Sequence, residues 1–227
     1  MPWSRLAAAL IALPLGAVLA YLGICQTVGA FLALRGNAVL ERYEDGAQTV
    51  TPAEAGKAVA LLERADGWRR DPGNSFNAGR LLMRLATPAA GGRYDPALLE
   101  RAQRYFAQSL VEAPANAAAW AALADTRLLR GEPLNEAADA LSMSIELARY
   151  DPALLAWRCR MGLALYPALD AEQKAEIGAQ IRLLGRQSAR ELIRIARSSG
   201  RMAVVITALN GDNETLREFL DNLRYVK

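Results

Sequence analysis

Residues 102–131 read AQRYFAQSLVEAPANAAAWAALADTRLLRG, and this stretch predicts two helices packed against each other. Pro114 separates the halves, and Gly131 is typical of the residue just after a helix. Small side chains in the pattern would let two helices approach closely, and the large ones would fill the interface. The pattern positions are Ala102, Phe106, Ser109, Trp120, Leu123 and Ala124. We therefore expect an antiparallel helix pair here rather than an active site.

The same spacing recurs on both sides of the central stretch. Apolar or small residues at i, i+4 and i+7 precede Asp71-Pro72 and again Asp151-Pro152, as they precede Pro114. These earlier and later positions are Ala58, Leu62 and Ala65, and Ala137, Leu141 and Ser144. Thr51-Pro52-Ala53-Glu54 predicts the start of the first of these helices. A repeated helix-pair unit follows from this recurrence.

Residues 53–166 resemble tetratricopeptide repeats in these motifs. The resemblance implies an all-α fold, an α-solenoid of helix pairs in which the first helix of each pair lines a concave face. Peptide ligands or acidic tails would meet that face.

A second resemblance covers residues 137–168 and the basic stretch after them. The motifs are Ser142-Met143-Ser144, Tyr150-Asp151-Pro152, Leu154-Leu155-Ala156-Trp157-Arg158 and Tyr166-Pro167. With a single N-terminal anchor, the chain is similar to small membrane-anchored proteins associated with bacterial exopolysaccharide and O-antigen synthesis. That group supplies no catalytic residues to carry over.

Composition removes several function classes. The chain of 227 residues has no histidine, which removes the commonest general base and metal ligand. The formal net charge is +3, and we expect no nucleic-acid partner from so mild a charge. The two cysteines, Cys25 and Cys159, lie in an apolar run and in an expected helix, so no disulfide is expected. We expect no metal, no cofactor and no catalytic residue.

The N-terminal run from Leu6 to Leu34 carries no charged side chain. About 20 apolar residues in a helix suffice to cross a bilayer, so this run predicts a transmembrane helix. Cleavage as a signal peptide after Val18-Leu19-Ala20 and lipid attachment at Cys25 are the alternatives. We favour the uncut anchor, with the N-terminus in the cytoplasm and everything after Arg35 exported from the bacterial inner membrane to the periplasm.

Four segments follow from these signals. Residues 1–36 are the expected transmembrane anchor, 37–51 a linker, 52–168 the tetratricopeptide-like repeats and 169–227 C-terminal closing helices. Asp170-Ala171-Glu172 predicts the start of one long helix that reaches Ser198-Ser199-Gly200. The apolar element at residues 201–209 is short, and a strand at Val204–Thr207 is an alternative for it.

Two sets of residues are candidate partner-binding positions. On the first helix of each pair, the tetratricopeptide resemblance points to Arg80, Asp125, Cys159 and Arg160, where arginine would bind carboxylates. The alternative is that these side chains are solvated or paired internally. On the expected long helix, a basic stripe recurs every fourth residue at Arg182, Arg186, Arg190 and Arg194. It would meet an anionic glycan, lipid or acidic protein, or else form a solvated face.

The combined expectation is a membrane-anchored interaction scaffold in a bacterial envelope assembly, such as one for exopolysaccharide or O-antigen synthesis or export. Its partners would be other envelope or membrane proteins. A glycan-processing enzyme, or an accessory domain of one, is the rival class. A secreted or lipid-anchored structural scaffold is a third alternative, which the processing of the N-terminus would decide.

Overall fold

The computed structural model describes residues 2–44, 50–87 and 93–225, with side chains from residue 12 onward. Within these ranges every regular element is a helix, which confirms the all-α expectation. The elements are α1 (Pro2–Glu44), α2 (Pro52–Trp68), α3 (Pro72–Ala86), α4 (Pro96–Glu112), α5 (Ala117–Arg130), α6 (Leu134–Leu147), α7 (Pro152–Leu165), the 3-10 turn η1 (Tyr166–Ala168), α8 (Ala171–Gln187), α9 (Ala189–Ser198), α10 (Met202–Leu209) and α11 (Asn213–Asn222).

Local capping interactions set most helix boundaries. At the start of α2 the Thr51 side chain accepts a hydrogen bond from the Glu54 backbone N–H (3.2 Å), and Glu54 accepts from the Thr51 backbone N–H (2.9 Å). The hydrogen bonds that the Thr51 backbone N–H and hydroxyl donate to its carboxylate lower the pKa of Glu54. Asp71 and Asp151 cap α3 and α7, each followed by a first-turn proline. The helix start that the sequence indicates at Thr51 is thereby confirmed, and the two Asp-Pro pairs, expected as the ends of the preceding helices, also begin the next ones.

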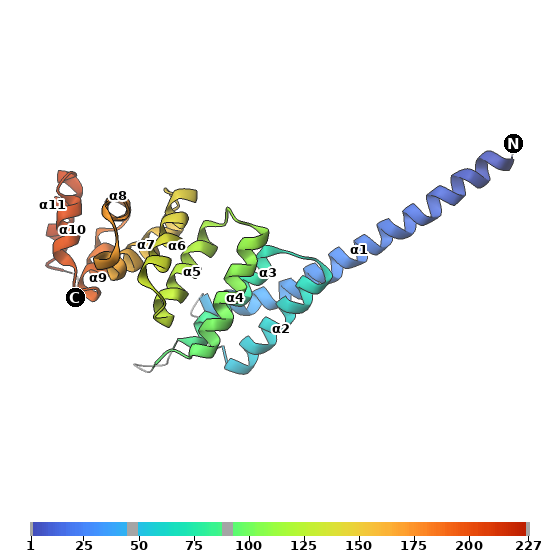
Figure 1. The fold of residues 1–227 in the computed structure, drawn as a ribbon, viewed down its shortest axis with the longest axis horizontal. Helices are drawn as coiled ribbons and strands as arrows, with labels where there is room; N and C mark the ends of the chain where they lie inside the picture. Colours follow the sequence, from blue (N-terminus) through green and yellow to red (C-terminus); the bar gives the residue numbers. More distant parts are fainter. Residues whose placement is uncertain (1, 45–49, 88–92, 226–227) are drawn as a thin grey trace.

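The helices after α1 stack into an elongated array of two rows (Figure 1). The odd-numbered helices contact one another along the array, α1 with α3, α3 with α5, α5 with α7 and α7 with α9. Of α2, α4, α6 and α8, only α6 and α8 make a comparable contact with each other within the described residues. Each even-numbered helix packs on the odd-numbered helices before and after it. The odd-numbered helices therefore form the closely packed row, and the even-numbered row is more open.

Two apolar cores fill this array, and tryptophans connect them. One core is built mainly on α2 to α5 with the end of α1, and the other extends from α5 to α11. Trp120 and Trp157 pack against both. Trp120 also donates a hydrogen bond through Nε1 to the Pro114 carbonyl (2.8 Å), which satisfies its polar group at the edge of the core.

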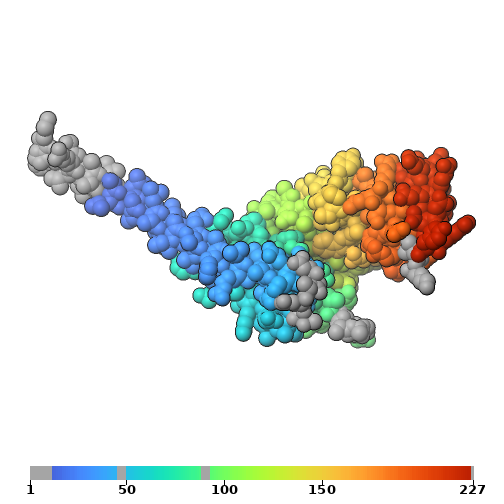
Figure 2. Space-filling view, turned by 180° about the vertical axis from the view of Figure 1, so that it is seen from behind, coloured from blue at the N-terminus to red at the C-terminus, as the bar shows by residue number. Residues whose placement is uncertain are grey.

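Helix α1 is uninterrupted from Pro2 to Glu44 and has two different surroundings (Figure 2). Its N-terminal part projects away from the array with exposed apolar side chains, whereas Leu40 near its C-terminus is only 3% exposed. Residues 37–44 are therefore helix packed on α2, not part of an irregular linker. Within the described residues α1 alone is long and apolar enough to cross a membrane. The remaining linker residues 45–49 lie outside the described residues.

Glycines allow α1 and α2 to pack closely. A Cβ at Gly36 would lie 2.7 Å from Cγ of Leu62, and one at Gly29 would lie 3.2 Å from Cβ of Arg69. By contrast, a Cβ at Gly16 or Gly23 would meet nothing within 4 Å. The contact with the array therefore begins near Gly29, inside the uncharged run.

The C-terminal segment differs from its expectation at two places. The expected long helix is broken at Ser188, whose side chain accepts a hydrogen bond from the Glu191 backbone N–H (3.3 Å) and so starts α9. The Val204–Thr207 strand alternative is wrong, because these residues lie within α10, which packs on α8 and α9. Tertiary packing outweighs the strand preference of this β-branched run.

Candidate binding surfaces

The odd-numbered row carries the first set of candidate residues. Arg80 lies on α3, Asp125 on α5 and Arg160 on α7. Asp125 and Arg160 lie close enough for the positive charge of Arg160 to lower the pKa of the Asp125 carboxyl. Arg80 instead meets α1. The three residues therefore share one row of helices without forming one cluster.

Asp125 is joined to the next repeat by a tryptophan. The indole Nε1–H of Trp157 on α7 donates to Oδ2 of Asp125 at 2.7 Å. Burial raises the pKa of the Asp125 carboxyl, and the Trp157 hydrogen bond and the Arg160 charge partly offset that effect. Arg160 itself is exposed. The row therefore places a mostly buried carboxylate, held by an indole, beside an exposed guanidinium.

Arg80 is occupied within the chain. Its guanidinium forms an ion pair with Glu44 at the end of α1 and donates to Oδ1 of Asn77 at 3.4 Å. It also lies over the Phe76 ring, 5.5 Å from the centroid. On the same two helices, Asn77 donates to Asn37 at 3.0 Å. Arg80 therefore helps to fasten α1 to α3, which is the internal pairing that the sequence left open as an alternative.

Cys159 faces the core rather than the solvent. It is fully buried among the side chains of the larger core, and burial raises the pKa of its thiol to about 12. The thiol is therefore poorly reactive, and of the two positions that the sequence allows for Cys159, core or groove, the structure shows the core.

The basic stripe is divided between two helices. Arg182 and Arg186 lie on α8, and Arg190 and Arg194 lie on α9 beyond the break at Ser188. The expectation that all four share one side of a single helix is therefore wrong, because the Ser188 cap changes the direction of the chain. Most of these arginines donate hydrogen bonds to residues of the C-terminal helices or of the turn before α11.

Three arginines of the stripe hold the last two helices. Arg182 donates to the Ala208 carbonyl of α10 at 3.0 Å, and Arg186 donates through Nε to Asp212, the N-cap of α11, at 2.7 Å. Arg190 donates to Asn222 at 3.4 Å. The Arg186 contact lowers the pKa of the Asp212 carboxyl. Arg194 pairs with Glu191 on its own helix. Much of the stripe is thus internally paired, and Arg186, Arg190 and Arg194 remain partly open to solvent.

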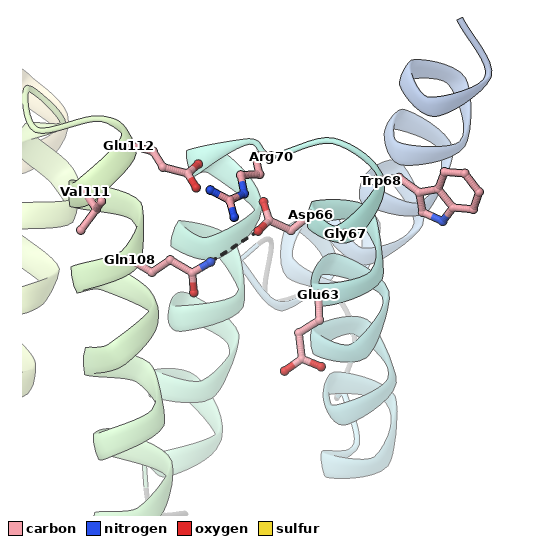
Figure 3. Close-up of a pocket in the computed structure, with 8 residues that line it drawn as sticks. All are labelled: Glu63, Asp66, Gly67, Trp68, Arg70, Gln108, Val111 and Glu112. Atoms are coloured by element: carbon pink, nitrogen blue, oxygen red, sulfur yellow. Dashed lines mark hydrogen bonds between the residues drawn. The ribbon is translucent and has the colours of Figure 1, made fainter. Parts of the chain in front are cut away.

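An open groove separates α2 from α4 on the even-numbered row (Figure 3). Across it, Gln108 donates to Asp66 at 3.4 Å, and one helical turn away Tyr105 donates to Glu63. Burial and the Glu63 carboxylate raise the pKa of Tyr105 to about 12. Trp68 points away from this groove (Figure 3). The groove is open to solvent, and Glu63 and Asp66 are paired across it, so it offers no enclosed ligand site.

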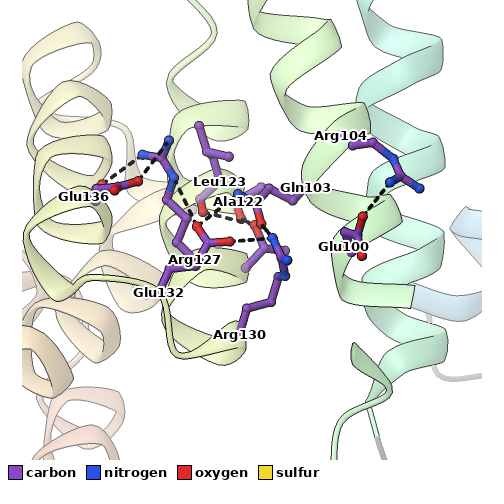
Figure 4. A network of polar contacts seen from close by, with 10 residues as sticks. Glu100, Gln103, Arg104, Ala122, Leu123, Arg127, Arg130, Glu132 and Glu136 are labelled. Atoms are coloured by element: carbon purple, nitrogen blue, oxygen red, sulfur yellow. Dashed lines mark hydrogen bonds and ion pairs between the residues drawn. The ribbon is translucent and has the colours of Figure 1, made fainter. Parts of the chain in front are cut away.

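A polar network closes the turn between α5 and α6 (Figure 4). Arg130 pairs with Glu132 and with Gln103 of α4, and Gln103 also donates to Glu132 at 3.1 Å. Arg127 donates to the Glu136 carbonyl at 3.0 Å and lies 3.8 Å from Glu132. Each of these charges has an opposite partner within the network, which favours a structural role in joining α4, α5 and α6.

The sequence reading overlooked Arg158, which is the largest fully buried side chain in the described residues. It donates to the Ala148 carbonyl at 2.8 Å, to the Ser144 carbonyl and to the Ser144 hydroxyl at 3.0 Å. Burial lowers the pKa of this guanidinium. The available signal was the position of an arginine among apolar residues on α7, in Leu154-Leu155-Ala156-Trp157 and Cys159.

No protein-family model matches the chain, and no curated protein matches it. Within the described residues, no cluster of three or more Cys, Asp or Glu side chains is placed to hold a metal ion.

Proposed function

We propose that this protein is a single-pass, membrane-anchored scaffold that binds other envelope or membrane proteins. Its array of helices would act as a tetratricopeptide-like interaction surface on the periplasmic side of a bacterial inner membrane. An exopolysaccharide or O-antigen synthesis or export machine is the assembly we favour, on the sequence resemblance alone. We infer a non-catalytic role, which agrees with the absence of histidine from the chain.

One observation carries this proposal. Helix α1 is a single element whose N-terminal part is apolar and exposed and whose C-terminal part is packed on α2 and α3. Exposed apolar side chains in such number are unfavourable in water and favourable in lipid. A helix built in this way would hold the array at a fixed distance and orientation above the bilayer. That arrangement suits a protein whose task is to position partners beside a membrane complex.

Two experiments test the proposal. A reporter enzyme that is active only in the periplasm, fused to the C-terminus, should be active, and a cytoplasmic reporter should be inactive. A photo-crosslinking amino acid at position 160, beside Asp125, should capture a defined membrane protein in native membranes. The same group at exposed position 146 on α6 serves as the control. Inverted reporter activities would contradict the topology, and identical capture at both positions would contradict the binding face.

A further inference from the structure

The turn between α2 and α3 lies where α1 leaves the array (Figure 1). Of the residues after α1, this turn is the part nearest the projecting N-terminal half of the helix (Figure 1). Close contact fixes this position, because a Cβ at Gly29 would lie 3.4 Å from the Ala65 carbonyl and 3.2 Å from Cβ of Arg69. The end of α2 is therefore level with Gly29 along the axis of α1.

The uncharged run of α1 continues beyond Gly29 to Leu34. The α2–α3 turn, which lies beside Gly29, must therefore limit how deeply α1 can enter a membrane. Charged Arg69 is exposed and would be strongly unfavourable in hydrocarbon. The spanning part must therefore lie before Gly29. Residues 6–28 would extend roughly 34 Å as a helix at about 1.5 Å per residue, enough for a hydrocarbon core of about 30 Å. The turn would then lie at the lipid headgroups.

The side chains of the turn suit that depth. Trp68 is 44% exposed at the end of α2 and points away from the groove between α2 and α4 (Figure 3). Tryptophan is enriched at membrane interfaces, where its ring meets apolar carbon and its N–H meets headgroups. Arg69 is half exposed and lies 3.8 Å from Asp71, while Asp66 is held by the Asp71 backbone N–H. Arg70 points toward the groove (Figure 3).

We propose that the α2–α3 turn docks on the phospholipid headgroup layer of the membrane that α1 enters, with Trp68 at the interface and Arg69 near lipid phosphates. This inference rests on the proposed anchoring by α1. With Trp68 held at the membrane interface, the array could not rotate about the α1 axis. This constraint would determine which faces of the array partners can reach.

Site-directed spin labelling of the full chain in vesicles of phosphatidylethanolamine and phosphatidylglycerol tests the proposal. Single cysteines replace Trp68, or Gly67 as a second site where a Cβ would meet nothing within 4 Å. The controls are Leu19 in the apolar part of α1 and the exposed apolar side chain Tyr150, farther along the array. Cys25 is replaced by alanine, and Cys159 is buried. The readout is accessibility of each label to a water-soluble nickel relaxation agent.

Docking predicts that nickel accessibility at positions 67 and 68 falls on the order of threefold below that at position 150, as expected for labels within an interface. It also predicts the lowest accessibility at position 19. If positions 67 and 68 are as accessible as 150 while 19 is protected, the anchor stands and the docking proposal is overturned. If position 19 is as accessible as 150, the anchor is overturned and the docking proposal fails with it.

Discussion

The guanidinium of Arg158 on α7 caps the C-terminal end of α6 through the carbonyl oxygen of Ala148, 2.8 Å away. The carbonyl and the hydroxyl of Ser144 accept hydrogen bonds from other N–H groups of the Arg158 guanidinium. The same hydroxyl donates to the Ala117 carbonyl at 2.7 Å. The last carbonyls of a helix lack partners within the helix and carry partial negative charge. Arg158 therefore joins α5, α6 and α7 through a buried group that satisfies otherwise unpaired oxygens.

Replacing Arg158 should be one of the most damaging single changes in the array. Arg158→Met keeps much of the apolar stem but leaves the Ala148 and Ser144 carbonyls without their donors. We expect the free energy of unfolding to fall by about 3 kcal/mol, measured by urea unfolding of the full chain in detergent. The exposed neighbour provides the control, since Arg160→Met should change stability by less than about 0.5 kcal/mol. Equal effects at the two positions would show that the buried contacts contribute little.

The close approach of α1 to α2 predicts opposite effects at two glycines. Gly36→Ala should lower the free energy of unfolding by about 1–3 kcal/mol, because the added Cβ collides with Leu62. Gly56→Ala on α2 should raise it by about 0.5–1 kcal/mol, because nothing lies within 4 Å and alanine is the better helix former. Urea unfolding of both variants in the same detergent checks the pair. Stabilisation by Gly36→Ala would contradict the packing of α1 on the array.

Asp125 predicts a defined pH dependence. Burial raises the pKa of its carboxyl, so the folded state holds this proton more tightly than the unfolded state does. The contribution of Asp125 therefore favours folding at low pH and is lost as the pH rises through the raised pKa. We compare wild type with Asp125→Asn, whose amide oxygen can still accept from Trp157. The stability difference, wild type minus variant, should fall as the pH rises above about 4, the ordinary pKa of an aspartate carboxyl. A difference that stays constant or rises would contradict the burial of this carboxyl.

The divided basic stripe predicts a local effect on the last two helices. Changing Arg182, Arg186, Arg190 and Arg194 together to glutamine removes donors to Ala208, Asp212 and Asn222. Amide hydrogen exchange should therefore rise in α10 and α11 while α3 to α6 keep their protection. Arg194→Gln alone should leave this exchange unchanged, because Arg194 pairs within α9. If the quadruple variant binds an anionic partner less well without faster exchange, the stripe is a binding surface and not a clamp.

Helix boundaries were largely predictable because they depend on local contacts. The Thr51 to Glu54 capping box and the Asp-Pro starts of α3 and α7 are readable directly in the sequence. The same rule contained a signal for the break that the sequence reading overlooked, since Ser188 and Glu191 have capping-box spacing. The apolar periodicity continues across Ser188, and by itself it favours one uninterrupted helix.

Contacts between distant elements were not predictable, because they depend on how the helices stack. The polar sequence from Glu41 to Gln48, with Gly46, predicts a linker, yet Leu40 packs in the core with α2 and α1 continues to Glu44. Arg80, Asp125 and Arg160 lie on α3, α5 and α7, which are alternate helices of the array. Their partners, Glu44 for Arg80 and Trp157 for Asp125, lie on other helices of the stack. No local pattern identifies such pairs.

Intact mass spectrometry of carbonate-washed membranes shows most directly whether α1 remains attached and holds the array at the membrane. Carbonate removes peripheral proteins and leaves proteins with a spanning helix. When this sequence is expressed, the account predicts a membrane-bound species at the mass of the uncut chain, 24.6 kDa. A soluble species shortened by the apolar part of α1, with no full-length chain left in the washed membranes, would contradict it.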